Sequence, residues 1–370
     1  MQAAVYEGPF TITVKERPKP IIKDDGDAIL KVQLAGLCGS DLHAYRGHQK
    51  TTTGHIMGHE FLGVIETVGP AVHKFKVGQK VMSIFSPMCM KCWFCKHGYT
   101  NRCQNGPSFG SMALDGGQAE YVRIPFADST LETIPDNVDD DLMMLMCDIF
   151  PTGYYGTMKA LTKLMQNTET AENILNFKPL QSAPQLSYTR QQLKDVTIVC
   201  LGCGPVGICG VLTAIALGAG TVYAVDSVPD RLEQARNMGA IPLTLGDDDI
   251  LSIIKTATDG RGADAVVENV GNRAAMRLAF DLVRPCGVIS SIGFHQSDLP
   301  FDAFEAYSKN IDLNMGRAAV RPVFGEALRI LIEHQDKLSS FISHKMPLTE
   351  AAKAYDMFEK HQARKVLFTL

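Results

Sequence analysis

Four cysteines lie close together in the sequence at short, regular intervals. Cys89, Cys92, Cys95 and Cys103 follow the pattern C-x2-C-x2-C-x7-C. Four thiolates at this spacing can surround one tetrahedral zinc ion, and such a closed site is structural because no coordination position stays open. An iron–sulfur cluster can use similar spacing, but the proline that follows the last cysteine of the bacterial ferredoxin pattern is absent. We therefore expect a structural zinc that braces the loop of residues 86–106.

A second set of residues offers a different ligand chemistry. Cys38 lies in the segment GLCGSDLH, His59 follows 21 positions later, and Asp148 lies shortly before the sequence Pro-Thr-Gly. Thiolate, imidazole and carboxylate together suit zinc, and three protein ligands with an open fourth position are typical of a catalytic site. Taken singly, each residue has an ordinary interpretation, because a buried cysteine is often just a small apolar residue and Asp148 can cap a helix. The sequence alone does not establish that the three segments meet.

A glycine-rich turn predicts a dinucleotide site. Gly202, Gly204 and Gly207 follow an apolar strand in G-x-G-x-x-G spacing, and a helix starts at Pro205 and Val206. The first glycine permits the tight turn, the second lets the backbone approach a pyrophosphate, and the third allows close packing of helix and strand. The N–H groups at the helix N-terminus would bind the phosphates.

An acidic residue after the second strand predicts the choice of cofactor. Asp226 ends the apolar strand that follows the glycine-turn helix. A carboxylate at this point bonds the adenosine ribose and repels a 2′-phosphate, so NAD is favoured over NADP. Arg231, on the next expected helix, would lie near the adenosine.

Length and composition limit the class of protein. With 370 residues, the chain is long enough for two domains. An apolar content of 45% and a charged content of 21% suit a soluble globular protein. A net charge of -4 without a basic tract gives no indication of nucleic-acid binding. No apolar run approaches the roughly 18 residues that a membrane span needs, and the start lacks signal-peptide features, so we expect a cytoplasmic protein.

The order of the expected elements indicates where the two domains lie. Short apolar segments separated by Gly and Pro make residues 1–150 β-rich. Helical spacing follows over 153–166, and then a polar stretch of about 167–194 is expected to form a loop or a short helix. Strands and helices then alternate, which predicts a doubly wound parallel sheet. The expected strands are 196–201, 221–225, 241–244, 264–268, 287–292 and 311–315. The expected helices are 205–217, 229–238, 248–258, 273–283 and 323–334. A helix at 348–360 and a strand at 365–370 should return to the first domain.

Taken together, the motifs resemble the zinc-dependent alcohol dehydrogenases of the medium-chain dehydrogenase/reductase superfamily. They occur in family order over nearly the whole chain and include Gly58-His59-Glu60 and the segment GGQAEY of residues 116–121. The resemblance implies an α/β protein with a β-rich, GroES-like catalytic domain of residues 1–157 and 324–370. Residues 158–323 would form a six-stranded Rossmann domain that binds NAD, with an inserted polar segment at about 160–194. Two zinc ions per chain and hydride transfer between NAD and an alcohol, or an aldehyde or ketone in reverse, follow from the same resemblance.

The resemblance also implies roles for residues around the two cofactors. Cys38, His59 and Asp148 would hold the catalytic zinc, and Glu60 would be a nearby or alternate ligand. Cys147 is the competing third ligand, but alignment on Pro-Thr-Gly favours Asp148, as in the formaldehyde dehydrogenase-like branch. The proton relay would consist of Ser40 and His43, unless Ser40 is a local cap and His43 a surface residue.

Four more residues receive roles in the same way. Gly293 and Phe294 would contact the nicotinamide, and Lys365 would meet the pyrophosphate, although it could also be a surface lysine. Phe85 would line the substrate pocket, although a lone aromatic is more often part of the core. Family relatives imply a homodimer or homotetramer formed through the sheet edge near 290–316.

Three alternatives remain open at this point. One is a polyol dehydrogenase, although that branch usually has Glu near the position of Asp148. Another is a formaldehyde dehydrogenase or dismutase that holds NAD tightly. The third belongs to a different class, a non-catalytic zinc- and nucleotide-binding relative. The substrate itself, a small alcohol or aldehyde, is not identified by any motif.

Overall fold

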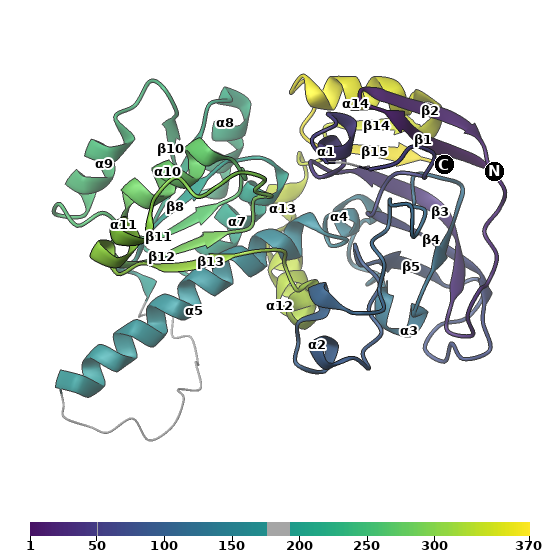
Figure 1. Cartoon of the computed structure of the whole chain (residues 1–370), viewed down its shortest axis with the longest axis horizontal. Coiled ribbons are helices and arrows are strands. Elements are labelled where there is room, and N and C mark those ends of the chain that lie inside the picture. Colours follow the sequence, from purple (N-terminus) through teal and green to yellow (C-terminus); the bar gives the residue numbers. More distant parts are fainter. Residues whose placement is uncertain (50, 176–192) are drawn as a thin grey trace. The chain divides into compact units, whose positions relative to one another are not determined.

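The chain divides into two compact units in the computed structural model, which describes residues 1–49, 51–175 and 193–370 (Figure 1). Unit 1 combines Met1–Pro151 with Ala319–Leu370, and unit 2 is Thr152–Ala318. The C-terminal segment therefore packs with the N-terminal part of the chain. We expected the boundaries slightly later, after residues 157 and 323, and the assignment of domains stays a prediction.

Unit 1 is built on strands that are antiparallel except for the pair β14 and β15. The hairpin of β1 (Gln2–Gly8) and β2 (Thr11–Glu16) lies beside a sheet in the order β14-β15-β3-β4-β5-β7, with β6 paired to β3. The strands of this sheet are β3 (Ala28–Leu37), β4 (Phe61–Val68), β5 (Lys80–Ser83), β6 (Tyr121–Ile124), β7 (Leu131–Thr133), β14 (His344–Pro347) and β15 (Val366–Thr369). Because β15 lies directly beside β3, the end of the described chain lies next to the strand that leads to Cys38.

Short helices connect and cover the strands of unit 1. They are α1 (Asp41–Tyr45), α2 (Trp93–Lys96), α3 (Ala127–Thr130), α4 (Asp140–Leu145), α12 (Val320–Glu333), α13 (Gln335–Leu338) and α14 (Ala351–Glu359), with 3-10 turns at Thr100–Arg102 and Leu348–Glu350. One hydrophobic core, which includes Leu30, Phe61, Tyr355 and Phe368, joins the sheet to α1 and α14. This core packs against the two inner strands β3 and β4, and so fixes the end of the sheet at which β3 ends and β4 begins.

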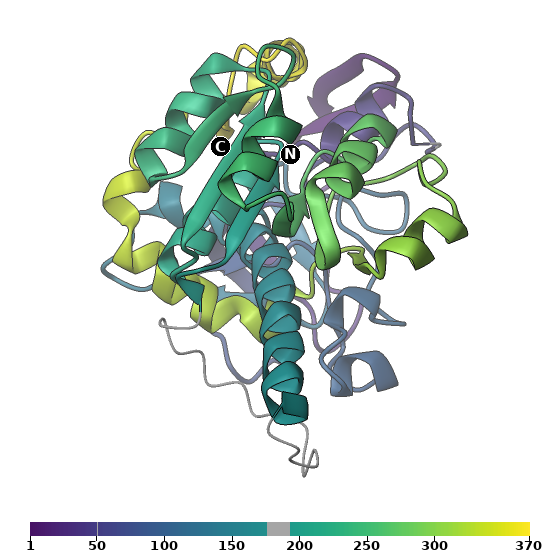
Figure 2. The same ribbon diagram turned by 90° about the vertical axis from the view of Figure 1, so that its left-hand side faces the viewer.

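Unit 2 is a parallel sheet in the order β10-β9-β8-β11-β12-β13. Its strands are β8 (Thr197–Leu201), β9 (Thr221–Asp226), β10 (Ile241–Thr244), β11 (Ala263–Glu268), β12 (Val283–Ser291) and β13 (Asp312–Met315). Its helices are α7 (Pro205–Ala216), α8 (Pro229–Met238), α9 (Ile250–Ala257), α10 (Arg273–Leu282) and α11 (Ala303–Lys309), together with most of α5 (Ile149–Leu175). Figure 2 faces this unit and shows helices in front of the sheet. Every residue of β8 and β11 is buried, which explains the apolar runs Ile198–Leu201 and Ala265–Val267 in these strands.

The expected Rossmann-type alternation is confirmed. All six expected strands are present, although β12 begins at Val283, four residues before the expected 287. The short elements α11, α13 and β14 were missed because they carry no clear periodic pattern.

The expected helix at 153–166 is longer at both ends. It becomes α5, which starts at Ile149 and continues to Leu175 because residues 167–175 contain neither Gly nor Pro. The rest of the expected polar insertion, residues 176–192, lies outside the described residues.

Candidate metal and nucleotide sites

One end of the unit 1 sheet brings four potential metal ligands together. Cys38, His59, Glu60 and Asp148, called here the mixed-ligand cluster, each offer one atom, and these atoms lie within 4.8 Å of one another. Cys38 follows β3 and His59 precedes β4. Because these strands are antiparallel neighbours, the two segments meet at the same end of the sheet. The Asp148 carboxylate lies 3.8 Å from Cys38 Sγ and 3.4 Å from His59 Nε2. The fold therefore joins the three segments that the sequence left separate.

Cys147 lies apart from this cluster although it is next to Asp148. Its thiol is buried and donates a hydrogen bond to the carbonyl of Phe61 at 3.6 Å. Burial raises the pKa of the Cys147 thiol, with a further contribution from Glu60. The competing ligand thus lies in an environment that favours the neutral thiol.

Asp41 is a site residue to which the sequence reasoning gave no role. Its Oδ1 lies 3.2 Å from Nδ1 of His59, and its Oδ2 accepts a hydrogen bond from the Cys38 backbone N–H at 3.0 Å. A carboxylate on one imidazole nitrogen orients the ring so that the other nitrogen can bind a metal. The signal was present in the motif, because a ligating histidine generally needs such a partner and Asp41 is the nearest carboxylate in the sequence to Cys38.

Carboxylates determine the charge state of His59 in the cluster. Burial alone would lower the pKa of His59, but Asp41 and Asp148, with Cys38, outweigh it and raise that pKa well above its usual value. Burial raises the pKa of Cys38, and Glu60 adds to this effect. A divalent cation that binds here would therefore compete with protons for Cys38 and His59.

One member of the cluster, Glu60, forms a buried ion pair with Lys365. Glu60 and Lys365 are fully buried, and Lys365 Nζ contacts Glu60 Oε2 and donates to the Leu37 carbonyl at 3.2 Å. The other oxygen, Glu60 Oε1, has no hydrogen-bond partner among the described residues. Lys365 is thus no surface residue, and its expected contact with a pyrophosphate stays a prediction.

The expected relay and pocket residues lie around the same cluster. Ser40 Oγ is 3.3 Å from both Cys38 Sγ and His59 Nε2, and it makes no capping bond to α1. His43 lies on α1 and is half-buried, and burial, with Arg46 and His48, lowers its pKa. The half-buried ring of Phe85 lies edge-on to His59 at 6.5 Å between centroids.

The four cysteines of the loop form a second, separate cluster. Their sulfur atoms lie within 4.8 Å of one another. Backbone N–H groups donate to these sulfurs, from Cys92 to Cys89 at 3.4 Å and from Cys89 to Cys103 at 3.2 Å. Burial opposes the effect, but N–H donors from Lys91, Asn105 and Cys92 lower the pKa of Cys89 to about 6. This four-cysteine cluster is thus preorganised for a thiolate-binding cation.

The glycine turn of unit 2 has the backbone that a phosphate site needs. Gly202 has φ +85°, and a side chain there would meet Val270 at 2.5 Å. A side chain at Gly207 would collide with the carbonyl of Gly202, whereas one at Gly204 would meet nothing within 4 Å. The backbone is therefore closely packed at Gly202 and Gly207, whereas the space beside Gly204 is open. The helix α7 begins directly after Gly204, with Pro205 and Val206.

Asp226 fastens the second strand to this turn. Its Oδ2 accepts a hydrogen bond from the Cys203 N–H at 2.7 Å, and its Oδ1 accepts one from Val228 at 2.9 Å. Arg231 Nη1 lies 3.6 Å from the same Oδ2. The carboxylate is thus held in a fixed orientation at the end of β9, beside the turn.

A buried polar network, also missed by the sequence reasoning, supports Gly293 and Phe294. Glu268, at the end of β11, accepts hydrogen bonds from the Ser291 hydroxyl at 2.7 Å and from the Gly271 N–H at 2.7 Å, and lies 2.9 Å from His295 Nε2. Burial opposes ionisation, but these donors lower the pKa of Glu268. The network joins the loops after β11 and β12 beside Gly293, and Phe294 is exposed.

Both sites fit the cofactors that the sequence implies. The mixed-ligand cluster joins soft and hard donors, and Glu60 Oε1, which is buried without a hydrogen-bond partner among the described residues, suits a cation. The four-cysteine cluster has the donor set of a closed zinc site. The open space before Gly204 faces the N-terminus of α7, which suits an anionic ligand.

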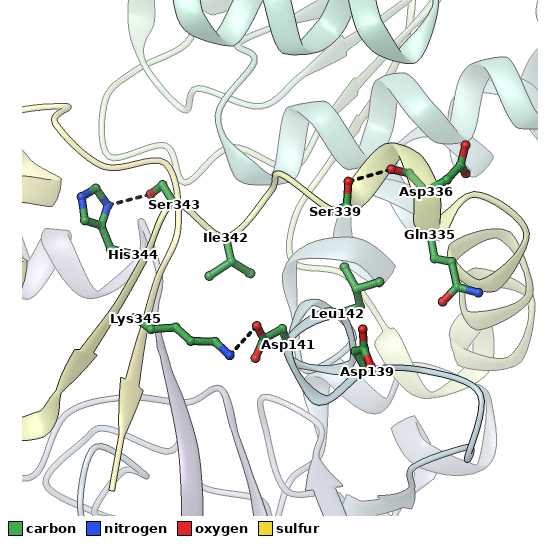
Figure 3. Close-up of a pocket in the computed structure, with 10 residues that line it drawn as sticks. All are labelled: Asp139, Asp141, Leu142, Gln335, Asp336, Ser339, Ile342, Ser343, His344 and Lys345. Atoms are coloured by element: carbon green, nitrogen blue, oxygen red, sulfur yellow. Dashed lines mark hydrogen bonds and ion pairs between the residues drawn. The ribbon is translucent and has the colours of Figure 1, made fainter.

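A surface cavity in unit 1 contains none of the expected site residues. It has a volume of about 420 Å³ (Figure 3). It is lined by Asp139, Asp141, Leu142, Gln335, Asp336, Ser339, Ile342, Ser343, His344 and Lys345. Lys345 and Asp141 form an ion pair at 2.6 Å across it.

The length and composition of the helices bear on membrane insertion. Among the described residues, no helix combines the length and the apolar character that a membrane span needs.

Two metal-competent clusters in a β-rich unit, with a glycine turn at the head of a parallel sheet, define the class of zinc-dependent medium-chain dehydrogenases. Residues 24–136 match the alcohol dehydrogenase GroES-like domain, and residues 205–333 match the zinc-binding dehydrogenase domain. The chain belongs to the zinc-type alcohol dehydrogenase family.

Similar proteins agree with this assignment. The chain is 41% identical over its whole length to zinc-type alcohol dehydrogenase B of Aspergillus flavus, covering 81% of that protein. It is 31% identical to a sorbitol dehydrogenase of Bacillus subtilis, over 85% of this chain and 81% of that protein. Among solved structures, alcohol dehydrogenase TADH from Thermus sp. ATN1 has a TM-score of 0.86 and 30% identity, with 100% of this chain and 99% of that chain covered. The protein is therefore an oxidoreductase of the alcohol and polyol dehydrogenase family, and its substrates are small molecules.

Proposed function

We propose that this chain is an NAD-dependent zinc alcohol dehydrogenase with one catalytic and one structural zinc. The observation that carries the proposal is the convergence of Cys38, His59 and Asp148 beside the exposed hydroxyl of Ser40. Unit 1 would be the catalytic domain and unit 2 the NAD-binding domain, in a cytoplasmic enzyme.

The residues of unit 1 would divide the work of the reaction. Zinc held by Cys38, His59 and Asp148 would lower the pKa of a substrate hydroxyl, and NAD would accept the hydride. Asp41 would keep the His59 ring in the orientation that presents Nε2. Because Ser40 Oγ lies 3.3 Å from Cys38 Sγ and from His59 Nε2, we propose that it accepts the substrate proton while it gives its own hydroxyl proton to the ribose of NAD, through which a proton reaches His43. His43, half-buried on α1, would pass it towards solvent, and Phe85 would form an apolar wall.

The residues of unit 2 would hold the cofactor. The N–H groups that follow Gly204 would bind the pyrophosphate, and Asp226 would accept hydrogen bonds from the adenosine ribose. Arg231, which lies 3.6 Å from Asp226, would help to hold that carboxylate in place. Gly293 and Phe294 would contact the nicotinamide, and Lys365 would act through Glu60 rather than as an exposed cation.

A homo-oligomer is part of the same proposal. β13 is an edge strand of the unit 2 sheet, and the preceding α11 has no buried residue. Two aromatic side chains of α11 are mostly exposed, Phe304 at 76% and Tyr307 at 79%. An open strand edge beside exposed aromatics suits pairing with a second copy. Light scattering of the purified protein measures the state, and a monomer at all concentrations would contradict it.

A combined metal and substrate measurement tests the proposal. We expect two zinc ions per chain and reduction of NAD with one or more members of a panel of primary alcohols, secondary alcohols, polyols and formaldehyde. The panel also decides between alcohols and polyols, since the relatives include a sorbitol dehydrogenase. The same panel run with NADP at matched concentration tests Asp226. Two bound zinc ions without turnover on any substrate would favour a non-catalytic relative.

A further inference from the structure

The side chain of Gln118 links the two segments that carry Cys38 and His59. Gln118 is fully buried, although glutamine is usually exposed. Its Nε2 donates a hydrogen bond to the Gly36 carbonyl at 3.1 Å, two residues before Cys38. Its backbone N–H donates to the Met57 carbonyl at 2.9 Å, two residues before His59. One residue therefore bonds to both segments.

Gln118 also occupies the space beside Gly58, the residue that precedes His59. Gly58 has φ +92°, and a Cβ there would lie 2.5 Å from Cγ of Gln118. The His59 segment can therefore pass over Gln118 only with glycine at this position. On the other side, Gly36 donates its N–H to the Glu60 carbonyl at 2.8 Å. Gln118 thus packs against the point at which the two segments cross.

A tyrosine from the far end of the chain fixes the orientation of this amide. The hydroxyl of Tyr355, on α14, donates to Oε1 of Gln118 at 3.0 Å, and both side chains are fully buried. The amide therefore presents its NH₂ group to Gly36. The ring of Tyr355 also lies 5.2 Å from that of Tyr45, at the end of α1, which begins with Asp41. Through Gln118 and Tyr45, Tyr355 is thus linked to the segments that carry Cys38, Asp41 and His59, but not to the segment of Asp148.

We propose that Gln118, oriented by Tyr355, is a positioning residue that sets the distance between Cys38 and His59 and thereby slows the loss of zinc. This inference depends on the proposed zinc at Cys38, His59 and Asp148. Buried hydrogen bonds in low dielectric fix the relative position of the groups they join. Ligands that are held at the right separation in the free protein lose less freedom on binding the metal, so the bound state is favoured.

The test measures the rate of zinc release to a chelator with a fluorescent zinc indicator, and the absorption spectrum of the cobalt-substituted protein. Cys38→Ala identifies which of the released zinc ions comes from the mixed-ligand cluster. Gln118→Met keeps the length of the side chain but removes both amide hydrogen bonds. Loss of a partner that supports a metal ligand typically weakens binding by 10- to 100-fold, so we expect zinc release about tenfold faster and a shifted cobalt spectrum.

Two further variants separate positioning from general stability. Tyr355→Phe removes only the hydroxyl, and we expect release faster than in the wild type but slower than in Gln118→Met. If the two residues act as one unit, the double variant releases zinc no faster than Gln118→Met alone. Thr130→Val is the matched control, because Thr130 is fully buried in unit 1 and its hydroxyl donates to Pro125 at 2.8 Å, away from the ligand segments. It should lower the unfolding temperature and leave zinc release unchanged.

The possible results are distinct. If Gln118→Met releases zinc at the wild-type rate with an unshifted spectrum, or if Thr130→Val speeds release equally, the inference is wrong. If Gln118→Met does not fold, Tyr355→Phe decides, and wild-type release in that variant contradicts the inference. If Cys38→Ala binds as much zinc as the wild type, the proposed function fails first, independently of Gln118.

Discussion

The two metal-competent clusters of unit 1 are built in opposite ways. The four-cysteine cluster takes all its ligands from Cys89–Cys103, whereas the mixed-ligand cluster draws on residues from 38 to 148. Mainly backbone N–H groups, together with the side-chain amide of Asn105, support the sulfurs of the first, and side chains, chiefly Asp41, support the second. A loop can therefore bring four ligands together by itself, but the mixed-ligand cluster depends on the sheet that joins distant segments.

Removing a ligand from the mixed-ligand cluster should have the largest effect on activity. Cys38→Ala should reduce kcat/KM by about 1,000-fold, because a metal contributes several kcal/mol to charge stabilisation and each ~1.4 kcal/mol is a factor of ten. Zinc content should fall from two ions per chain to one, with a small change in unfolding temperature. Steady-state kinetics and metal analysis measure both. Unchanged activity at half the zinc content would mean that zinc in the mixed-ligand cluster is not needed for the reaction, and the proposed difference between the two clusters would be wrong.

The second-largest loss of activity is expected from a change of the third ligand. Asp148→Asn should lower both activity and zinc affinity by about 100-fold, since it removes the negative charge of a direct ligand. Cys147→Ala, its neighbour and matched control, should keep the zinc because the Cys147 thiol bonds to Phe61 instead. Equilibrium dialysis with zinc compares them. The opposite pattern, with zinc lost only in Cys147→Ala, would make Cys147 the ligand.

Asp41→Asn tests whether the support of the mixed-ligand cluster comes from side chains. The amide keeps the size of Asp41 but no longer favours the imidazole tautomer that presents Nε2, so we expect a 10- to 100-fold loss of zinc affinity. Competition with a chelator of known affinity gives the value. Full zinc affinity in this variant would indicate that the backbone alone holds His59.

Cys92→Ser should have the smallest effect on the reaction and a large one on stability. Loss of the structural zinc removes several kcal/mol of folding free energy, and the unfolding temperature should fall by on the order of 10 °C. At low temperature, kcat per folded chain should stay near the wild-type value. Calorimetry and kinetics on one preparation check this, and a loss of activity as large as that of Cys38→Ala would mean that both clusters take part in the reaction.

The sequence predicted the features that depend on local spacing. The four cysteines, the glycine turn and the six strands of unit 2 were all recognised because each pattern lies within a short stretch. The family, and with it the zinc and alcohol dehydrogenase assignment, was also predicted correctly. The formaldehyde dehydrogenase branch stays a prediction, as do the individual roles of the site residues.

What the sequence did not predict depends on contacts between distant segments. Asp41, at the start of α1, pairs with His59, which precedes β4. Gln118 bonds to Gly36 and to Tyr355, which lies 237 positions after Gln118. Glu268 and His295 meet only because β11 and β12 are parallel neighbours. No periodic pattern encodes these pairs. The burial of Lys365 against Glu60 was missed for the same reason.

The position of β15 determines when the buried surroundings of the mixed-ligand cluster can be completed during synthesis. This strand lies between β14 and β3 and is made only after the whole of unit 2 has been translated. Until then, the edge of β3 beside Leu37 is unpaired, and Glu60 lacks its lysine. Contacts between segments this far apart are slow to form because a long loop must close first. The four cysteines of the loop can therefore come together early on the nascent chain, whereas the buried contact between Glu60 and Lys365 must wait for the last described strand.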